Sequence, residues 1–121
     1  MAGKLVPLVV WPRFTTFAGG NMTEGYTTLP LDVSGYSQAL FTVWRGPATV
    51  GFTMTSEEST DKVAWTTCAG SNTNGYDPGT GTEGIVTATL KKQWFRVRVV
   101  NPGNDNQVTC WAVGHLARRE R

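Results

Sequence analysis

The clearest hydrophobic pattern in this chain is a strict alternation over residues 94–101. One side of this stretch is purely apolar, with Phe95, Val97 and Val99, and the other side carries Trp94, Arg96, Arg98 and Val100. A period of two predicts a β-strand with one face on a hydrophobic core. The opposite face carries tryptophan and arginine, which are enriched where proteins contact partners.

The same kind of pattern recurs along the chain, and no stretch of ten or more residues keeps a helical period. About eight strands are predicted, at residues 4–11, 26–33, 38–45, 49–55, 63–67, 85–90, 94–101 and 107–113. A polar turn is expected at 57–61 and a long loop at 69–84, where Asn74-Gly75 and Asp77-Pro78-Gly79 are strong turn signals.

Short strands at this spacing predict an all-β fold, an antiparallel β-sandwich of about eight strands. A jelly roll is the architecture we expect, while a barrel or an immunoglobulin-like sandwich remains open. Pro7 and Pro12 interrupt the first apolar stretch, which suits an edge strand or an extended arm. The expected organisation is an extended N-terminal arm with a glycine-rich connection (1–25), a sandwich domain (26–117) and a basic tail (118–121).

Composition narrows the class of protein. A chain of 121 residues has room for one domain, and its net charge of +2 is too small to indicate direct nucleic-acid binding. The apolar run 5–11 is too short for a membrane span or an export signal, so synthesis in a reducing cytoplasm is expected. Cys68 and Cys110 could pair, but two buried free thiols is the preferred interpretation.

Residues for catalysis are scarce. His115 is the single histidine and is expected beyond the last strand, where it would be solvated, so neither a catalytic triad nor a multi-histidine metal site is expected. Glu57, Glu58 and Asp61, with Asp77 or Asp105, could form a calcium site, but a solvated turn fits their spacing better. We therefore expect no enzyme activity, no metal and no cofactor.

The five tryptophans leave alternatives open. Trp11, Trp44, Trp65, Trp94 and Trp111 could stack on sugars, fill the core or contact other subunits. Two or three are expected inside the domain and one or two at a contact. The pair Arg96 and Arg98 could be a solvated sheet face, a face that meets acidic partners, or a phosphate site.

Several segments over residues 38–113 resemble the jelly-roll capsid cement (decoration) proteins of tailed bacteriophages. They are Phe41-Thr-Val-Trp-Arg45, Val50-Gly-Phe-Thr-Met54, Glu57–Trp65, Trp94–Asn101 and Val108-Thr-Cys-Trp111. A similar order of motifs also occurs in discoidin-like carbohydrate-binding sandwiches and in phage tail modules. The alternative is therefore a carbohydrate- or receptor-binding β-sandwich of a tail or fibre.

The resemblance implies a structural virion protein on the capsid surface. Such a protein clamps subunits of the major capsid protein, self-associates as a dimer or trimer, and is made in the bacterial cytoplasm. The N-terminal arm is expected to extend to neighbouring subunits. The basic face of the strand at 94–101 and the basic tail are expected to contact acidic surface on the shell. The expected interface residues are Leu5, Val6, Leu8, Val10, Trp11, Trp94, Arg96, Arg98, Arg118, Arg119 and Arg121.

Overall fold

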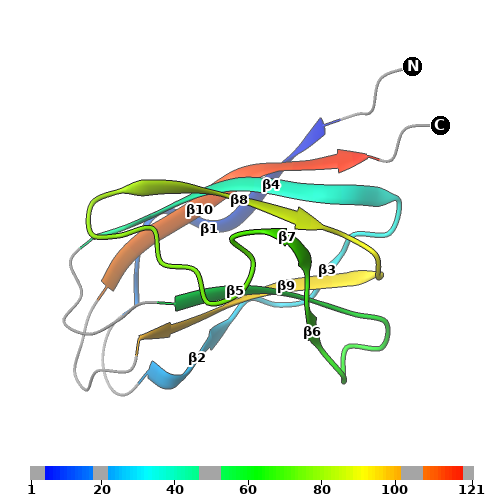
Figure 1. Cartoon of the computed structure of the whole chain (residues 1–121), viewed down its shortest axis with the longest axis horizontal. Helices are drawn as coiled ribbons and strands as arrows, with labels where there is room; N and C mark the ends of the chain where they lie inside the picture. The colour runs from blue at the N-terminus through cyan, green and yellow to red at the C-terminus, as the bar shows by residue number, and fades with distance from the viewer. Residues whose placement is uncertain (1–4, 18–21, 47–52, 102–107, 119–121) are drawn as a thin grey trace.

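The computed structural model describes residues 5–17, 22–46, 53–101 and 108–118, and every regular element in these ranges is a strand. The strands are β1 (Leu5–Phe17), β2 (Met22–Thr27), β3 (Leu31–Asp32), β4 (Tyr36–Arg45), β5 (Thr53–Ser59), β6 (Thr66–Thr67), β7 (Ala69–Ser71), β8 (Glu83–Thr89), β9 (Trp94–Asn101) and β10 (Val108–Arg118). They form two antiparallel sheets packed face to face (Figure 1). The predicted β-sandwich is confirmed, with ten strands in place of about eight.

The strand order is that of a chain folded back on itself and wrapped across two sheets. Sheet A has the order β1-β10-β4-β8-β7, and sheet B has the order β2-β9-β5-β6, with β3 also on β9. The pairs are nested: β1 with β10, β2 with β9, β4 with β8, and β5 with β6. These eight strands give the jelly-roll arrangement, to which β3 and β7 are short additions.

The core lies between the sheets and is built from alternate residues of the long strands. In β9, Phe95, Val97 and Val99 are buried, as their spacing predicts. In β4 the buried positions include Phe41 and Val43. Strands of this kind bury one face and leave the other to solvent or a partner.

The N-terminal segment is part of the sandwich, which corrects its assignment to an arm. Residues 5–17 form edge strand β1 along β10, with Leu5 opposite Ala117 and Phe17 opposite Val108. Leu8 and Trp11 are buried in the core. Pro7 is tolerated because β1 lies at the edge of sheet A. The glycine-rich residues 18–21 lie outside the described residues.

The end of β5 also differs from the prediction. The strand runs to Ser59, so Glu57 and Glu58 lie in a strand and the turn comes later, at residues 60–64. The Asp61 carboxylate accepts hydrogen bonds from the backbone N–H groups of Val63 and Ala64, at 2.9 and 3.0 Å. These bonds hold the turn where a strand at 63–67 was expected, and only β6 remains of that strand.

The region predicted as one long loop, 69–84, contains structure of its own. Strand β7 pairs with β8, and Tyr76 bridges to Met54 in β5. The last strand is longer than predicted as well. It continues to Arg118, so His115 lies inside β10 and not beyond it.

Candidate interaction surfaces

The outer face of sheet B carries the basic and aromatic residues that the sequence singles out. The Arg96 guanidinium lies 4.1 Å from the centre of the Trp65 ring, and its Nε donates a 2.7 Å hydrogen bond to Glu57 Oε1. Lys62 Nζ lies 4.4 Å from the centre of the Trp94 ring. Arg98 continues the same side of β9 and is opposite Thr55 of β5. We call residues Glu57, Lys62, Trp65, Trp94, Arg96 and Arg98 the basic face.

Cation–π contacts of this kind stabilise exposed side chains by about 0.5–1 kcal/mol. They also hold flexible basic chains in fixed positions, which lowers the entropy lost when a partner binds. Arg96 is held by both an ion pair and a ring contact. The prediction that residues 94, 96 and 98 share one surface is therefore confirmed, while their role in binding stays a prediction.

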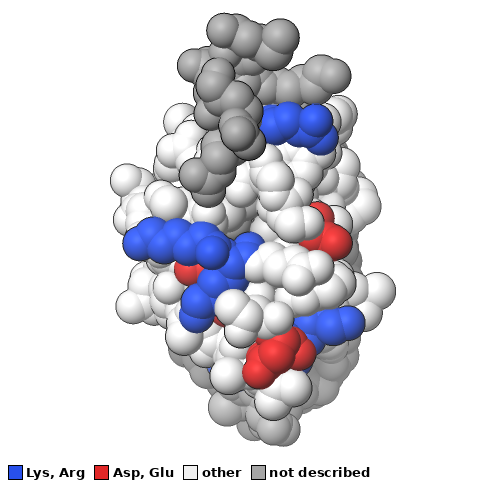
Figure 2. All heavy atoms as spheres, turned by 90° about the vertical axis from the view of Figure 1, so that its right-hand side faces the viewer, with Lys and Arg blue, Asp and Glu red and all other residues white. Residues whose placement is uncertain are grey.

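The end of the sandwich next to this face is mixed in charge. The β8–β9 turn holds Lys91 and Lys92, and the Lys92 Nζ donates to Thr66 Oγ1 at 3.1 Å. Figure 2 looks at this end and shows basic and acidic side chains interspersed on it. Such a surface presents no single-sign field large enough to attract a polyanion.

The other expected interface residues are spread over several places. Leu8 and Trp11 are buried in this chain's own core, and Val6 and Val10 pack against it, so these four do not form a free apolar arm. Leu5 is in β1. Arg118, the last residue of β10, lies 5.4 Å from the centre of the Tyr36 ring. Arg119 and Arg121 lie outside the described residues.

The outer face of sheet A was missed by the sequence analysis, and it is largely apolar. Strand pairing places its side chains in rows across four adjacent strands. The central row is Val9, Val113, Thr42 and Ile85. The row on one side of it is Pro7, His115, Leu40 and Thr87. The row on the other side is Trp111, Trp44 and Glu83. We call these three rows the apolar face; Val9 and Ile85 are 59% and 65% exposed, whereas Trp111 is buried, at 4%.

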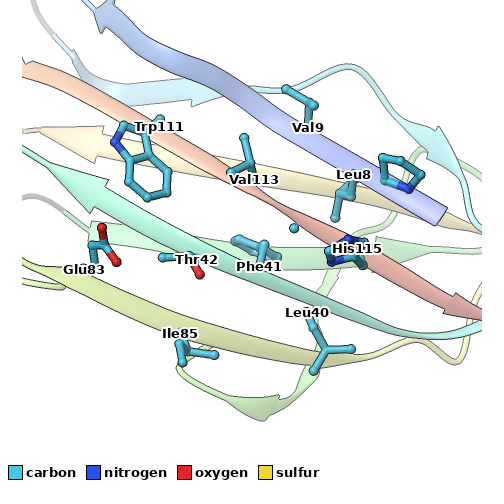
Figure 3. Close-up of a pocket in the computed structure, with 12 residues that line it drawn as sticks. Leu8, Val9, Leu40, Phe41, Thr42, Glu83, Ile85, Trp111, Val113 and His115 are labelled. Carbon is cyan, nitrogen blue, oxygen red and sulfur yellow. The ribbon is translucent and has the colours of Figure 1, made fainter. Parts of the chain in front are cut away.

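The apolar face is hollowed. A shallow, open depression of about 500 Å³ lies over it, and Figure 3 shows its lining side chains on β1, β10, β4 and β8. At one end the rings of Trp44 and Trp111 stack, with centroids 6.5 Å apart and planes inclined by 12°. The signal that could have revealed this face is in β4, where Leu40 and Trp44 alternate with equally apolar residues.

The acidic residues considered for calcium have partners within the chain. The Glu58 side chain points to the core, and its Oε1 accepts from the backbone N–H groups of Lys91 and Lys92 at 2.8 and 3.1 Å. Asp77 forms a two-point ion pair with the buried Arg45, at 2.7 and 3.1 Å. Within the described ranges no three histidine, cysteine or acidic side chains group as metal ligands; Asp105 lies outside them.

The two candidate thiol nucleophiles are shielded, whereas the histidine is not. Both cysteines are buried and unpaired with one another. Burial, and then the negative charges of Glu58 and Glu57, raise the pKa of Cys68 to about 12. Burial raises the pKa of Cys110 to about 12 as well. A thiol with such a pKa carries almost no thiolate at neutral pH and is a poor nucleophile. His115 is exposed on the apolar face, between Pro7 and Leu40.

Comparisons with known proteins show that a solved structure shares the fold of this chain. No protein-family model and no curated protein sequence matches the chain. Among solved structures, the SPBc2 prophage-derived protein YomS is similar, with a TM-score of 0.53 and 12% sequence identity over 94% of this chain and 96% of that one. At this identity the likeness shows a shared fold over nearly the full length of both chains. No helix in the described ranges has the length and hydropathy to span a bilayer.

Proposed function

We propose that this chain is a structural protein of a phage particle, and more specifically a cement (decoration) protein on the capsid surface. The observation that carries the proposal is the jelly-roll fold that it shares, over nearly the full length of both chains, with a prophage-derived protein. The motifs in residues 38–113 that resemble phage cement proteins support the same function. Its partner is the major capsid protein, and the chain is synthesised in the host cytoplasm.

The basic face suits docking on an acidic shell. Lys62, Arg96 and Arg98 outnumber the single carboxylate of Glu57 among its charged members, and Trp65 and Trp94 supply rigid aromatic area. A clamp that binds only the assembled lattice stabilises that lattice by mass action. Several modest contacts per particle site act together because each bound copy raises the local concentration of the others.

We further propose that the chain is not an enzyme. The sole histidine has apolar cross-strand neighbours, Pro7 and Leu40, which could neither orient it nor accept its proton. The two thiols are held in the protonated form by burial. A base without an orienting partner and a nucleophile without a base do not make a catalytic pair.

The sugar-binding alternative draws support from Trp65 and Trp94, which are half-buried on one face. A pyranose ring stacks on an open indole face. One face of Trp65 is covered by Arg96 and one face of Trp94 by Lys62, so a sugar would have to use the opposite sides. This arrangement favours contact with an acidic protein surface over stacking on a glycan.

Binding to shells tests the proposal. Preformed capsid shells should retain the protein in a sedimentation assay, while free coat subunits should not. Arg98→Ala should weaken shell binding by about tenfold, because one charged contact in an interface is worth about 1–2 kcal/mol. Lys91→Ala removes an exposed lysine of the β8–β9 turn, outside the basic face, and is the matched control. Retention on a glycan array, lost on Trp65→Ala, together with no binding to shells would instead establish the sugar-binding module.

A further inference from the structure

The two sheets of this sandwich have very different outer faces. Antiparallel sheets commonly bury one face and place polar side chains on the other. Sheet B follows this rule, since its outer face carries Arg96, Arg98, Thr55 and Glu57. Sheet A does not, since the central row of its outer face is Val9, Val113, Thr42 and Ile85. An apolar area of this kind on a small domain marks a contact surface.

We infer that the apolar face of sheet A is a self-association surface, on which a second copy of this chain packs face to face about a two-fold axis. The inference goes beyond the proposed function, and it stands or falls without any capsid partner. The occupant follows from the area, charge and shape of the face.

The area of the apolar face is at the lower limit of what a specific dimer needs. Four strands about 4.8 Å apart, over about five residues of 3.3 Å each, give a face of roughly 19 by 19 Å once side chains are included. Two such faces sum to about 720 Å² as flat areas, and surface relief brings the buried area towards the roughly 1,000 Å² of a specific interface. We therefore expect a weak dimer in equilibrium with the monomer.

The charge of the apolar face also suits a second copy. Among its described side chains, Glu83 alone carries a formal charge at neutral pH with His115 neutral, and it lies at the end of the Trp111–Trp44 row. Two copies can face one another without placing like charges in the centre of the contact. An acidic or basic partner, in contrast, would find nothing on this face to pair with.

The shape of the face offers both a projection and a recess. Ile85 lies on β8, at the side of the apolar face next to β7, and is 65% exposed, and the hollow of about 500 Å³ lies beside it. In a two-fold contact the Ile85 of each copy can enter the hollow of the other, since a self-complementary interface makes every such contact twice. Figure 3 shows Val9 and Ile85 on opposite sides of this hollow, with Val113 and Thr42 between them.

Sedimentation velocity over a series of protein concentrations tests the inference. The average mass of the wild type should rise from the 13.2 kDa of one chain towards twice that value. Ile85→Asp should keep the protein monomeric over the whole series, because its carboxylate would have to leave water in the partner's hollow, where Glu83 already carries a like charge. Val63→Asp changes an even more exposed aliphatic residue, in the β5–β6 turn and off the apolar face, and should associate like the wild type.

Other outcomes would overturn the inference. A wild type that stays monomeric throughout, or an Ile85→Asp variant that associates like the wild type, contradicts it. So does a limiting mass of three chains, because an isologous face closes at two. If the wild type is monomeric but Ile85→Asp loses binding to shells, the apolar face contacts the coat protein, and the proposed function survives without the self-association.

Discussion

At the scale of single residues, the ion pair between Arg45 and Asp77 makes the sharpest prediction. The Arg45 guanidinium is buried and donates to both Asp77 oxygens and to Thr80 Oγ1. Asp77→Asn removes the charge that this buried cation faces, so we expect the free energy of unfolding to fall by about 2 kcal/mol. That is less than the roughly 3–5 kcal/mol for a fully buried pair, because the Asp77 side chain is 34% exposed.

The matched control is Asp32→Asn, at an exposed aspartate that accepts hydrogen bonds from the backbone N–H and the hydroxyl group of the nearby Ser34. It should change stability far less, and chemical denaturation of both variants provides the comparison. Equal losses would mean that Asp77 contributes only a local turn contact.

The same pair predicts a dependence on pH. The hydrogen bond from Arg45 is the main cause that lowers the pKa of Asp77 below its ordinary value of 3.8. In acid the unfolded chain therefore binds a proton at this site before the folded chain does, and stability falls as pH drops from about 3.8 through the folded pKa. This part of the acid destabilisation should be missing in Asp77→Asn. A wild type and variant with parallel stability curves below pH 4 would contradict the assignment.

At the scale of elements, substitutions in strand β1 test whether the N-terminal segment is a strand of the sandwich or an extended arm. Leu8 is buried in the core and Val9, one residue further, is largely exposed on the outer face. Leu8→Ala should lower the free energy of unfolding by about 2–4 kcal/mol, since it leaves a cavity. Val9→Ala, the control, should cost well under 1 kcal/mol in a dilute monomer. Denaturant titration measures both. If Leu8→Ala leaves the free energy of unfolding unchanged, the N-terminal segment is an extended arm and not a strand of the sandwich.

Strand β9 could be predicted to the residue because its alternation is unbroken from Trp94 to Asn101. Strand β1 could not, because its register with β10 shifts between Val9 and Trp11 and again between Trp11 and Thr15. The shift between Val9 and Trp11 places Trp11 on the same buried face as Leu8, three positions earlier, so the period of two is lost from the sequence although the strand persists.

The end of β5 could not be predicted from the sequence for a different reason. A pair of glutamates predicts a solvated turn, but Glu58 is satisfied by the N–H groups of Lys91 and Lys92, more than thirty positions away. Similarly, the sequence predicted which residues share the outer side of β9, but not that Arg96 pairs with Glu57 and covers Trp65. Contacts between distant segments decide these positions, and no local pattern carries them.

At the scale of the whole molecule, the nested strand pairs make the two ends of the chain mutually dependent. Strand β1 completes sheet A only when β10 is present, although ninety residues separate them. Such long-range pairing slows folding and leaves few independently stable parts. We therefore expect one cooperative unfolding transition.

The two cysteines report on that transition from opposite ends of the fold. Cys68 lies between β6 of sheet B and β7 of sheet A, where the chain crosses from one sheet to the other, and Cys110 lies in β10. Each should react with a thiol reagent only on unfolding. The labelling rate of Cys68 in Cys110→Ala, and of Cys110 in Cys68→Ala, should therefore each give an opening free energy equal to the equilibrium stability of that variant. A Cys110 that is labelled much sooner would show that β1 and β10 open as a separate unit.

Alkaline pH extends the same prediction. Both thiols have a pKa near 12 in the folded chain against the ordinary value of 9.0. Above pH 9 the unfolded chain releases these protons while the folded chain retains them, so stability falls as pH rises from 9 towards 12. Replacing both cysteines by alanine should flatten this part of the stability curve while lowering stability at neutral pH through the lost packing. An unchanged alkaline slope in the double variant would show that the buried thiols ionise without unfolding.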